Sequence, residues 1–311
     1  MSNKDVLVSV HMITFNHEQY IGQAIDGVLF QKTTFKFELV IGEDCSTDKT
    51  ANIVKEYSNK YPHIIKARCN TKNMGSLNNS LNVFGICTGK YLALCEGDDY
   101  WTDPNKLQKQ VDFLEANDDY AICFHKTDCI NNETKEQLFE QPSIVENTIY
   151  EFTDFIKFNP IATASVLFER KYIEQLPIWF DKAIFGDLTL YLIILLNSKK
   201  KAVCLNDTMS VYRIHSKGVH GNAHLSKKGL IKAYKEHIVF WIFIKKHLMN
   251  NAYGSDIKKT IKGDYTLLIN TLLYEGLFRE AFKTNTQLLF RLLYVKTSIV
   301  FYITIIKNRF K

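Results

Sequence analysis

Apolar runs alternate with helical patterns over the first 125 residues of the chain. The runs are four to eight residues long, which is the length of buried strands, and the segments between them carry apolar residues at helical spacing. We predict strands at Val6–Ile13, Phe37–Ile41, Ile64–Ala67, Tyr91–Leu94 and Tyr120–Phe124. The predicted helices lie around residues 21–29, 50–54, 81–86 and 104–117. Strands separated by helices indicate βαβ units, so the sequence predicts an α/β fold with a mostly parallel sheet.

The rest of the chain changes character twice. Residues 126–150 are polar and patternless, which predicts a long loop. Further along we predict a strand at Thr163–Phe168, helices near 170–176 and 187–198, and short strands at Ala202–Leu205 and Ser210–Arg213. From residue 226 onward the spacing is helical throughout. We therefore predict an α/β domain over 1–225 and a helical region over 226–311.

The composition is that of an ordinary globular protein. Of the 311 residues, 46% are hydrophobic and 23% charged, which excludes disorder for most of the chain. Lysine and arginine number 39 against 33 acidic residues, and the net charge of +6 falls short of the basic footprint of a nucleic-acid-binding protein. The seven cysteines form no CxxC pair, which favours buried free thiols and a reducing cytoplasm.

The two ends of the chain bear on localisation. The polar N-terminus leads directly into a predicted strand, so we expect no signal peptide. The longest uncharged run of the tail, Thr297–Ile306, has ten residues and is too short to span a bilayer. Lys296, Lys307, Arg309 and Lys311 flank apolar residues, which suits an anionic lipid surface; an ordinary packed helix or an oligomer contact fits as well. We expect a cytoplasmic protein, soluble or peripheral on the inner face of the membrane.

An acidic cluster follows the predicted strand Tyr91–Leu94. Glu96, Asp98 and Asp99 are three carboxylates within four residues, and they repel one another unless a cation neutralises them. In open α/β sheets, ligands bind at the carboxyl ends of strands, and carboxylate oxygens suit Mg²⁺ or Mn²⁺. The motif predicts a metal site that can hold the phosphates of a nucleotide. The alternative is an acidic turn before the helix near Pro104.

Polar side chains also end the first two predicted strands. Thr14 and Asn16 follow the first strand, and Glu43 and Asp44 follow the second. An Asp that accepts from a ring N–H favours uracil or thymine over purines. Each group alone is an ordinary turn, but three strand ends that converge on one crevice predict a nucleotide site.

Several ordered motifs resemble those of glycosyltransferase family 2, and the similarity covers roughly residues 5–220. These motifs are Ser9–Asn16, Glu43–Asp48, Asn73–Gly75, Gly89–Tyr91 and Glu96–Asp99. The resemblance implies a GT-A fold, in which helices flank a Rossmann-like sheet, with a helical appendage at the C-terminus. It implies an inverting enzyme that uses a nucleotide sugar, similar to bacterial enzymes of capsule and lipopolysaccharide synthesis.

The resemblance implies roles for the donor-site residues. Thr14 and Asn16 correspond to contacts with the base and ribose, and Asp44, with Glu43 beside it, to an acceptor from uracil N3. Glu96, Asp98 and Asp99 stand in for the Asp-x-Asp motif that holds Mn²⁺ or Mg²⁺, with Asp98 also facing the nucleotide. Where many relatives carry Ala-Arg-Asn, this chain has Asn78–Leu81 without an arginine, so this segment has no implied donor contact.

The resemblance implies further roles towards the end of the α/β region. Asp187 corresponds to the general base, although a carboxylate at the start of an apolar helix is also an N-cap. Arg213 corresponds to a diphosphate contact, and His215 to a phosphate or metal contact, with a structural role as its alternative. Tyr100 and Trp101 suit the wall of an acceptor site, and a core position suits Trp101 equally.

Together these residues predict a single displacement. Asp187 takes the proton of an acceptor hydroxyl as it attacks the anomeric carbon of a UDP-sugar, and the metal stabilises the diphosphate that leaves. The expected acceptor is a glycan or a lipid-linked oligosaccharide. The alternatives are a catalytically degenerate nucleotide- or glycan-binding scaffold and a sugar nucleotidyltransferase. Sugar nucleotidyltransferases usually carry a glycine-rich basic loop after the first strand. This chain has Asn16–Tyr20 in that place, which argues against that class.

Overall fold

The computed structural model describes residues 6–143, 149–215, 218, 226–248, 252–292 and 298–304. The contacts within the chain divide it into two compact units. The first unit comprises residues 1–181 and 186–214, and the second comprises residues 182–185 and 215–311. The boundary predicted at residue 225 lies outside the described residues.

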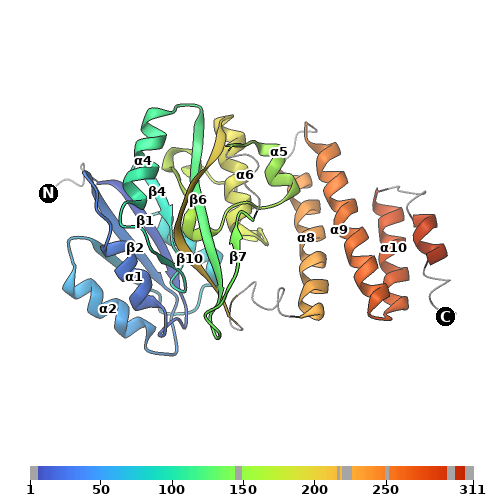
Figure 1. Cartoon of the computed structure of the whole chain (residues 1–311), viewed down its shortest axis with the longest axis horizontal. Helices are drawn as coiled ribbons and strands as arrows, with labels where there is room; N and C mark the ends of the chain where they lie inside the picture. The colour runs from blue at the N-terminus through green and yellow to red at the C-terminus, as the bar shows by residue number, and fades with distance from the viewer. Residues whose placement is uncertain are drawn as a thin grey trace. The chain divides into compact units, whose positions relative to one another are not determined.

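The first half of unit one is a run of βαβ elements, in the predicted order. The strands are β1 (Val6–Thr14), β2 (Lys36–Glu43), β3 (Ile65–Cys69) and β4 (Tyr91–Leu94), and the helices between them are α1 (Ile21–Leu29), α2 (Thr50–Lys60) and α3 (Ser76–Phe84). β1 pairs in parallel with both β2 and β4, and β2 pairs in parallel with β3 (Figure 1). These pairings confirm the α/β fold with a mostly parallel central sheet.

β1 lies at the centre of this parallel group and is buried along most of its length. Val8, Val10 and Met12 have no exposed surface, and neither do Ile21 and Ile25 of the neighbouring helix. In β1 these apolar residues alternate with the buried polar residues Ser9 and His11, whereas β4 is one apolar run. Both patterns are typical of strands, which is why the sequence locates β1 and β4 so closely.

The second half of unit one extends the sheet. It contains β5 (Tyr100–Trp101), α4 (Lys106–Ala116), β6 (Tyr120–Asn131), β7 (Gln137–Gln141), β8 (Ile149–Tyr150), α5 (Phe152–Lys157), β9 (Leu167–Glu169), α6 (Gly186–Ser198) and β10 (Lys201–Ile214). The sheet has ten strands in the order β3-β2-β1-β4-β9-β6-β10-β5, with β7 beside β6 and β8 beside β10. β9 is antiparallel to β4 and β6, whereas β10 is parallel to β6.

Four sequence predictions are wrong in this region. The predicted loop over 126–150 contains the end of β6 and all of β7, which form a hairpin. The two short strands predicted between 202 and 213 are one strand, β10. The strand predicted at Thr163–Phe168 begins as a 3₁₀ turn and becomes β9 only at Leu167, and the helix near 170–176 is a single 3₁₀ turn.

From residue 226 onward the described part of unit two is helical, as the sequence predicts. α8 (Lys227–His247), α9 (Gly254–Tyr274) and α10 (Phe278–Leu292) pack in sequence order, and Figure 1 shows them side by side. Ser226 is the N-cap of α8, and its hydroxyl accepts a hydrogen bond from the backbone N of Gly229.

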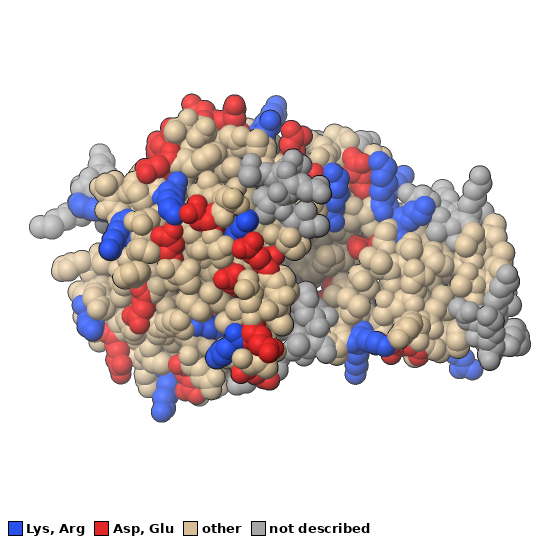
Figure 2. All heavy atoms as spheres, viewed as in Figure 1, with Lys and Arg blue, Asp and Glu red and all other residues tan. Residues whose placement is uncertain are grey.

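Two observations bear on the environment of the molecule. None of the helices within the described ranges is both long and apolar enough to cross a bilayer. On the face shown in Figure 2, basic and acidic side chains are interspersed. The basic tail residues Lys296, Lys307, Arg309 and Lys311 lie outside the described residues, so their membrane contact stays a prediction.

Candidate active site

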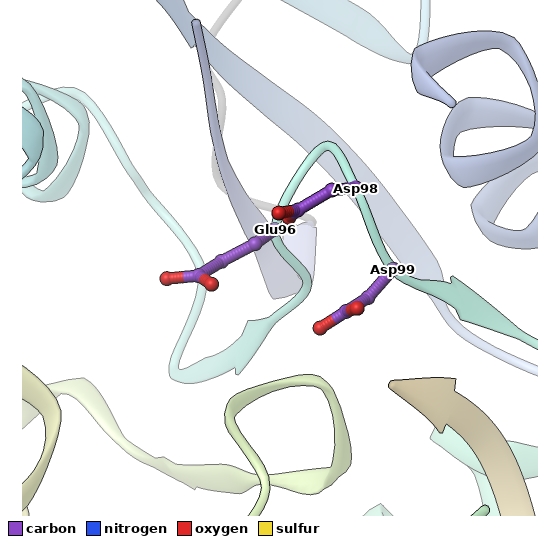
Figure 3. Close-up of side chains that lie close together, drawn as sticks. All are labelled: Glu96, Asp98 and Asp99. Atoms are coloured by element: carbon purple, nitrogen blue, oxygen red, sulfur yellow. The ribbon is translucent and has the colours of Figure 1, made fainter. Parts of the chain in front are cut away.

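Three carboxylates meet in the loop that follows β4. Glu96, Asp98 and Asp99 each offer an oxygen, and these atoms lie within 4.8 Å of one another (Figure 3). No other group of three potential metal ligands occurs in the described parts of the chain. The loop continues along β1, because the backbone N of Cys95 donates to His11 O and that of Gly97 to Ile13 O. The position of β4 beside β1 therefore places the acidic cluster at the carboxyl end of the sheet.

Keeping all three carboxylates of this cluster ionised costs free energy, because they are close together and largely shielded from water. Burial, and then the charges of Asp98 and Asp187, raise the pKa of Glu96 to about 8. Burial and the two neighbouring carboxylates also raise the pKa of Asp99 well above its usual value. Asp99 has no exposed surface, and its Oδ2 accepts no hydrogen bond from any described residue. A set of oxygen ligands with one buried oxygen left unbonded fits a hard divalent cation.

The loop after β1 packs directly on this cluster. Thr14 is buried, and its hydroxyl finds no hydrogen-bond partner in the described structure. A Cβ on Gly97 would fall 2.6 Å from that hydroxyl, so only glycine lets the two loops approach so closely. His17, which the sequence analysis does not single out, places its Nε2 3.6 Å from Asp98 Oδ2. No sequence signal marks His17 beyond its position after the first strand.

The strand-end residues predicted for the nucleotide lie side by side. The backbone N of Asn16 donates to Ser46 Oγ, and Asn16 Oδ1 accepts from the backbone N of Thr47. Asn16 has a left-handed φ of 56°, which asparagine tolerates better than most residues. Glu43 is buried, and its Oε1 accepts from the backbone N of Ser46. The loops after β1 and β2 therefore form one hydrogen-bonded surface.

Asp44 ties this surface to a third loop. Its carboxylate accepts hydrogen bonds from Asn70 Nδ2 and from the backbone N of Met74 and Gly75, at 2.8–2.9 Å. The backbone N of Asp44 donates to Thr14 O. The carboxylate thus orders the turn before α3, and its fixed orientation is compatible with one more donor.

Asp187 lies in the first turn of α6, where the helix dipole favours a carboxylate. Asn159 Nδ2 donates to Asp187 Oδ2 at 3.3 Å, a contact that the sequence analysis misses. The charge of Asp187 contributes to the raised pKa of Glu96, so the two carboxylates interact electrostatically. Tyr191, one turn further along α6, is fully buried, and burial together with the charges of Asp187 and Glu96 raises its pKa.

Two predicted contacts have a different setting in the structure. Trp101 is 3% exposed, and its Nε1 donates to Ala164 O at 2.7 Å, which is the core position left open for it. Arg213 is 5% exposed, and its guanidinium donates to the carbonyl of Asp98 and to Gln23 Oε1; the phosphate contact that the resemblance implies for it stays a prediction. Tyr100 lies against this guanidinium. His215 belongs to unit two, so its role at the metal stays a prediction.

Comparisons with known proteins agree with this geometry. The model of the family described as glycosyl transferase family 2 matches residues 9–176. An uncharacterized protein of Mycobacterium tuberculosis is 34% identical over 222 residues, which are 71% of this chain and 62% of the relative. The match therefore leaves more than a third of that relative's length uncovered. A Bacillus subtilis protein named for teichuronic acid biosynthesis, the glycosyltransferase TuaG, is 25% identical over 76% of this chain and 90% of its own length.

The fold also has a solved counterpart. The crystal structure of S. aureus TarS residues 1–349 in complex with UDP-GlcNAc superimposes with a TM-score of 0.62 and 17% identity. The similarity covers 98% of this chain and 91% of that one. At this identity the likeness concerns the fold alone. The family match spans more than half of the chain and includes the loops after β1, β2 and β4. The chain therefore belongs to glycosyltransferase family 2.

Proposed function

We propose that this glycosyltransferase transfers a sugar from a UDP-sugar, with inversion, to a hydroxyl of a glycan or lipid-linked acceptor in bacterial surface polysaccharide synthesis. The observation that carries the proposal is the group of three carboxylates beside the joined loops of Thr14 and Asp44. The surface-polysaccharide role is supported by the relative named for teichuronic acid biosynthesis, and the UDP donor by the TarS complex. Residues 1–225 would form the catalytic domain.

The donor site follows from the contacts described above. Asp44 has its carboxylate fixed by three donors, so it can accept from the N–H of a uracil ring without moving. Thr14 offers a hydroxyl that no described residue uses, and Asn16 lies beside it at the joined loops. Glu43 stabilises the loop after β2, because its Oε1 accepts a hydrogen bond from the backbone N of Ser46.

Glu96, Asp98 and Asp99 would hold Mn²⁺ or Mg²⁺. An ion held there would supply positive charge to the diphosphate, which leaves as its bond to the anomeric carbon breaks. Asp187 would accept the proton of the acceptor hydroxyl as that oxygen attacks the anomeric carbon, and Asn159 would hold one of its carboxylate oxygens. Attack from the face opposite the diphosphate gives a β-linked product from an α-linked donor. Tyr100 stays a prediction for the acceptor side.

The test is nucleoside diphosphate release from a panel of UDP-, dTDP- and GDP-sugars, with Mn²⁺ and with EDTA. We expect turnover of one UDP-sugar by the wild type, lost in EDTA and reduced at least about 100-fold in Asp98→Asn. Asp112→Asn, an exposed acidic residue of α4, is the matched control and should retain full activity.

Two outcomes would contradict the proposal. A silent panel combined with no calorimetric binding of UDP in Mn²⁺ would exclude a UDP-sugar enzyme. The binding scaffold would be favoured if the wild type binds UDP but shows no turnover even when lipid and glycan extracts are supplied as acceptors. In that case Asp187→Asn would bind UDP as the wild type does.

A further inference from the structure

Arg213 faces the acidic loop because of a short antiparallel pairing. In the pairing of β5 with β10, Val211 lies opposite Tyr100 and Ser210 opposite Trp101. Antiparallel partners keep a constant sum of residue numbers, so two residues beyond this ladder Arg213 comes opposite Asp98. The backbone N of Arg213 donates to Asp99 Oδ1 at 2.9 Å. The end of β10 therefore meets the acidic loop directly.

The guanidinium of Arg213 joins four groups around that loop. It donates to the carbonyl O of Asp98 and to Gln23 Oε1 of α1. Its Cζ atom lies 4.3 Å from the ring centroid of Tyr100 and 5.3 Å from that of Tyr20. A planar cation against two aromatic rings with two directed hydrogen bonds has few alternative orientations.

These contacts leave one carboxylate oxygen of Asp99 unused. Arg213 binds the backbone carbonyl of Asp98 rather than its carboxylate, and it uses only Oδ1 of Asp99. Asp99 Oδ2, on the other side of the same carboxylate, accepts no hydrogen bond from the described residues. The arginine thus holds the loop through the Asp98 carbonyl and Asp99 Oδ1. Its positive charge also offsets part of the repulsion among the three carboxylates.

We propose that Arg213 is a positioning residue that holds Asp98 and Asp99 in the arrangement that receives the divalent cation, with Tyr20, Tyr100 and Gln23 fixing its orientation. The proposal rests on the metal site of the proposed function. It differs from a phosphate contact in one measurable respect, because a positioning residue affects the cation and the loop when no nucleotide is present.

The test measures the binding of Mn²⁺ alone by electron paramagnetic resonance, together with amide hydrogen exchange of residues 96–101 without metal. We expect Arg213→Lys to weaken Mn²⁺ binding by about 10–100-fold and to accelerate exchange in this segment. Lysine keeps the charge but lacks the planar fork that spans Asp98 and Gln23. Gln23→Ala, at an exposed position on α1, removes one contact only, and we expect a smaller change in the same direction.

Arg170→Lys is the matched control. Arg170 also donates to a backbone carbonyl, that of Gly89, but at the other end of β4. We expect it to leave both readouts at wild-type values. Asp98→Asn identifies the Mn²⁺ signal as that of the acidic cluster.

Each outcome decides a different point. Unchanged Mn²⁺ affinity and unchanged exchange in Arg213→Lys, with UDP binding alone weakened, would overturn the positioning role and restore the phosphate contact. If the wild type binds no Mn²⁺, the metal part of the proposed function fails, and the exchange of residues 96–101 still decides whether Arg213 orders the loop.

Discussion

Gly97 is the residue at which the two loops of the site come closest. A Cβ there would lie 2.6 Å from Thr14 Oγ1 and 2.7 Å from Thr14 Cβ, distances that only a shift of the loop can relieve. We expect Gly97→Ala to lower the free energy of unfolding by about 1–3 kcal/mol. We also expect it to weaken Mn²⁺ and UDP binding at least about tenfold. Calorimetric titration and urea unfolding measure the two effects.

Gly85→Ala is the control for this prediction. Gly85 follows α3 with a helical φ of −64°, and the nearest atoms to an added Cβ lie at 3.6 Å. Both quantities should stay at wild-type values in this variant. Wild-type ligand binding in Gly97→Ala would mean that the two loops adapt independently of each other.

The residues of the site differ in how far sequence reveals them. Glu96, Asp98 and Asp99 are predictable because the acidic motif and its strand are adjacent in the chain. The bond from Asn159 to Asp187 crosses 28 residues and that from Arg213 to Gln23 crosses 190, so neither pair leaves a local pattern. The phosphate contact that the family resemblance implies for Arg213 stays a prediction, and the partners that surround its guanidinium come from distant parts of the chain.

The first residue of α4, Lys106, is a lysine buried against β5. Lys106 has no exposed surface; its Nζ donates to Gln110 Oε1 at 2.7 Å and lies 4.0 Å from the ring centroid of Trp101. Gln110 in turn donates to Cys123 O and Ser165 O. This chain of polar contacts connects α4 to β6 and to the turn before β9. Burial lowers the pKa of Lys106 to about 7.

This pKa predicts a pH-dependent stability. Below pH 7 the lysine is protonated in both states, whereas between pH 7 and about 10.5 only the unfolded chain holds the proton, so its contribution to the free energy of unfolding rises with pH. Lys106→Met removes this contribution. We therefore expect the free energy of unfolding of Lys106→Met minus that of wild type to fall, by up to about 1.4 kcal/mol per pH unit, from pH 7 towards pH 10. Urea unfolding over this range measures it.

Lys109→Met, three residues further along α4, is the matched control. Asp103 and Asp207 raise the pKa of Lys109 above its usual value, so its protonation does not change between pH 7 and 10. The stability difference of this variant should be constant over that range. A constant difference for Lys106→Met as well would show that Lys106 keeps its proton in the folded protein.

The end of β6 escapes prediction because its buried side chains form no apolar run. In β6, Thr127 and Cys129 point inward beyond the apolar stretch, and Thr127 Oγ1 shares a hydrogen bond of 2.8 Å with Ser210 Oγ of β10. Such a pair satisfies both hydroxyls, so the strand needs no further apolar residue. Hydrophobic periodicity detects β1 because apolar residues recur at every second position and β4 because it is apolar throughout, and the end of β6 has neither pattern.

At the scale of the whole molecule, the candidate site lies within one of the two units. The carboxylates, the loops after β1 and β2, and Asp187 all belong to unit one, and of the predicted residues only His215 belongs to unit two. A ligand that binds only the folded state stabilises the unit that contains its site, by about 2.7 kcal/mol at 100 times its dissociation constant. For a unit of roughly 200 residues this raises the melting temperature by about 5–10 °C.

We therefore expect UDP with Mn²⁺ to slow amide hydrogen exchange in the loops after β1, β2 and β4, while exchange in α8, α9 and α10 stays unchanged. Hydrogen-exchange mass spectrometry of the full chain, with ligand and with EDTA, measures both units at once. Asp98→Asn should abolish the protection because it removes a carboxylate of the metal site. Equal protection of α8–α10 and of the site loops would contradict the assignment of the nucleotide to unit one, since it requires that the helices themselves take part in binding.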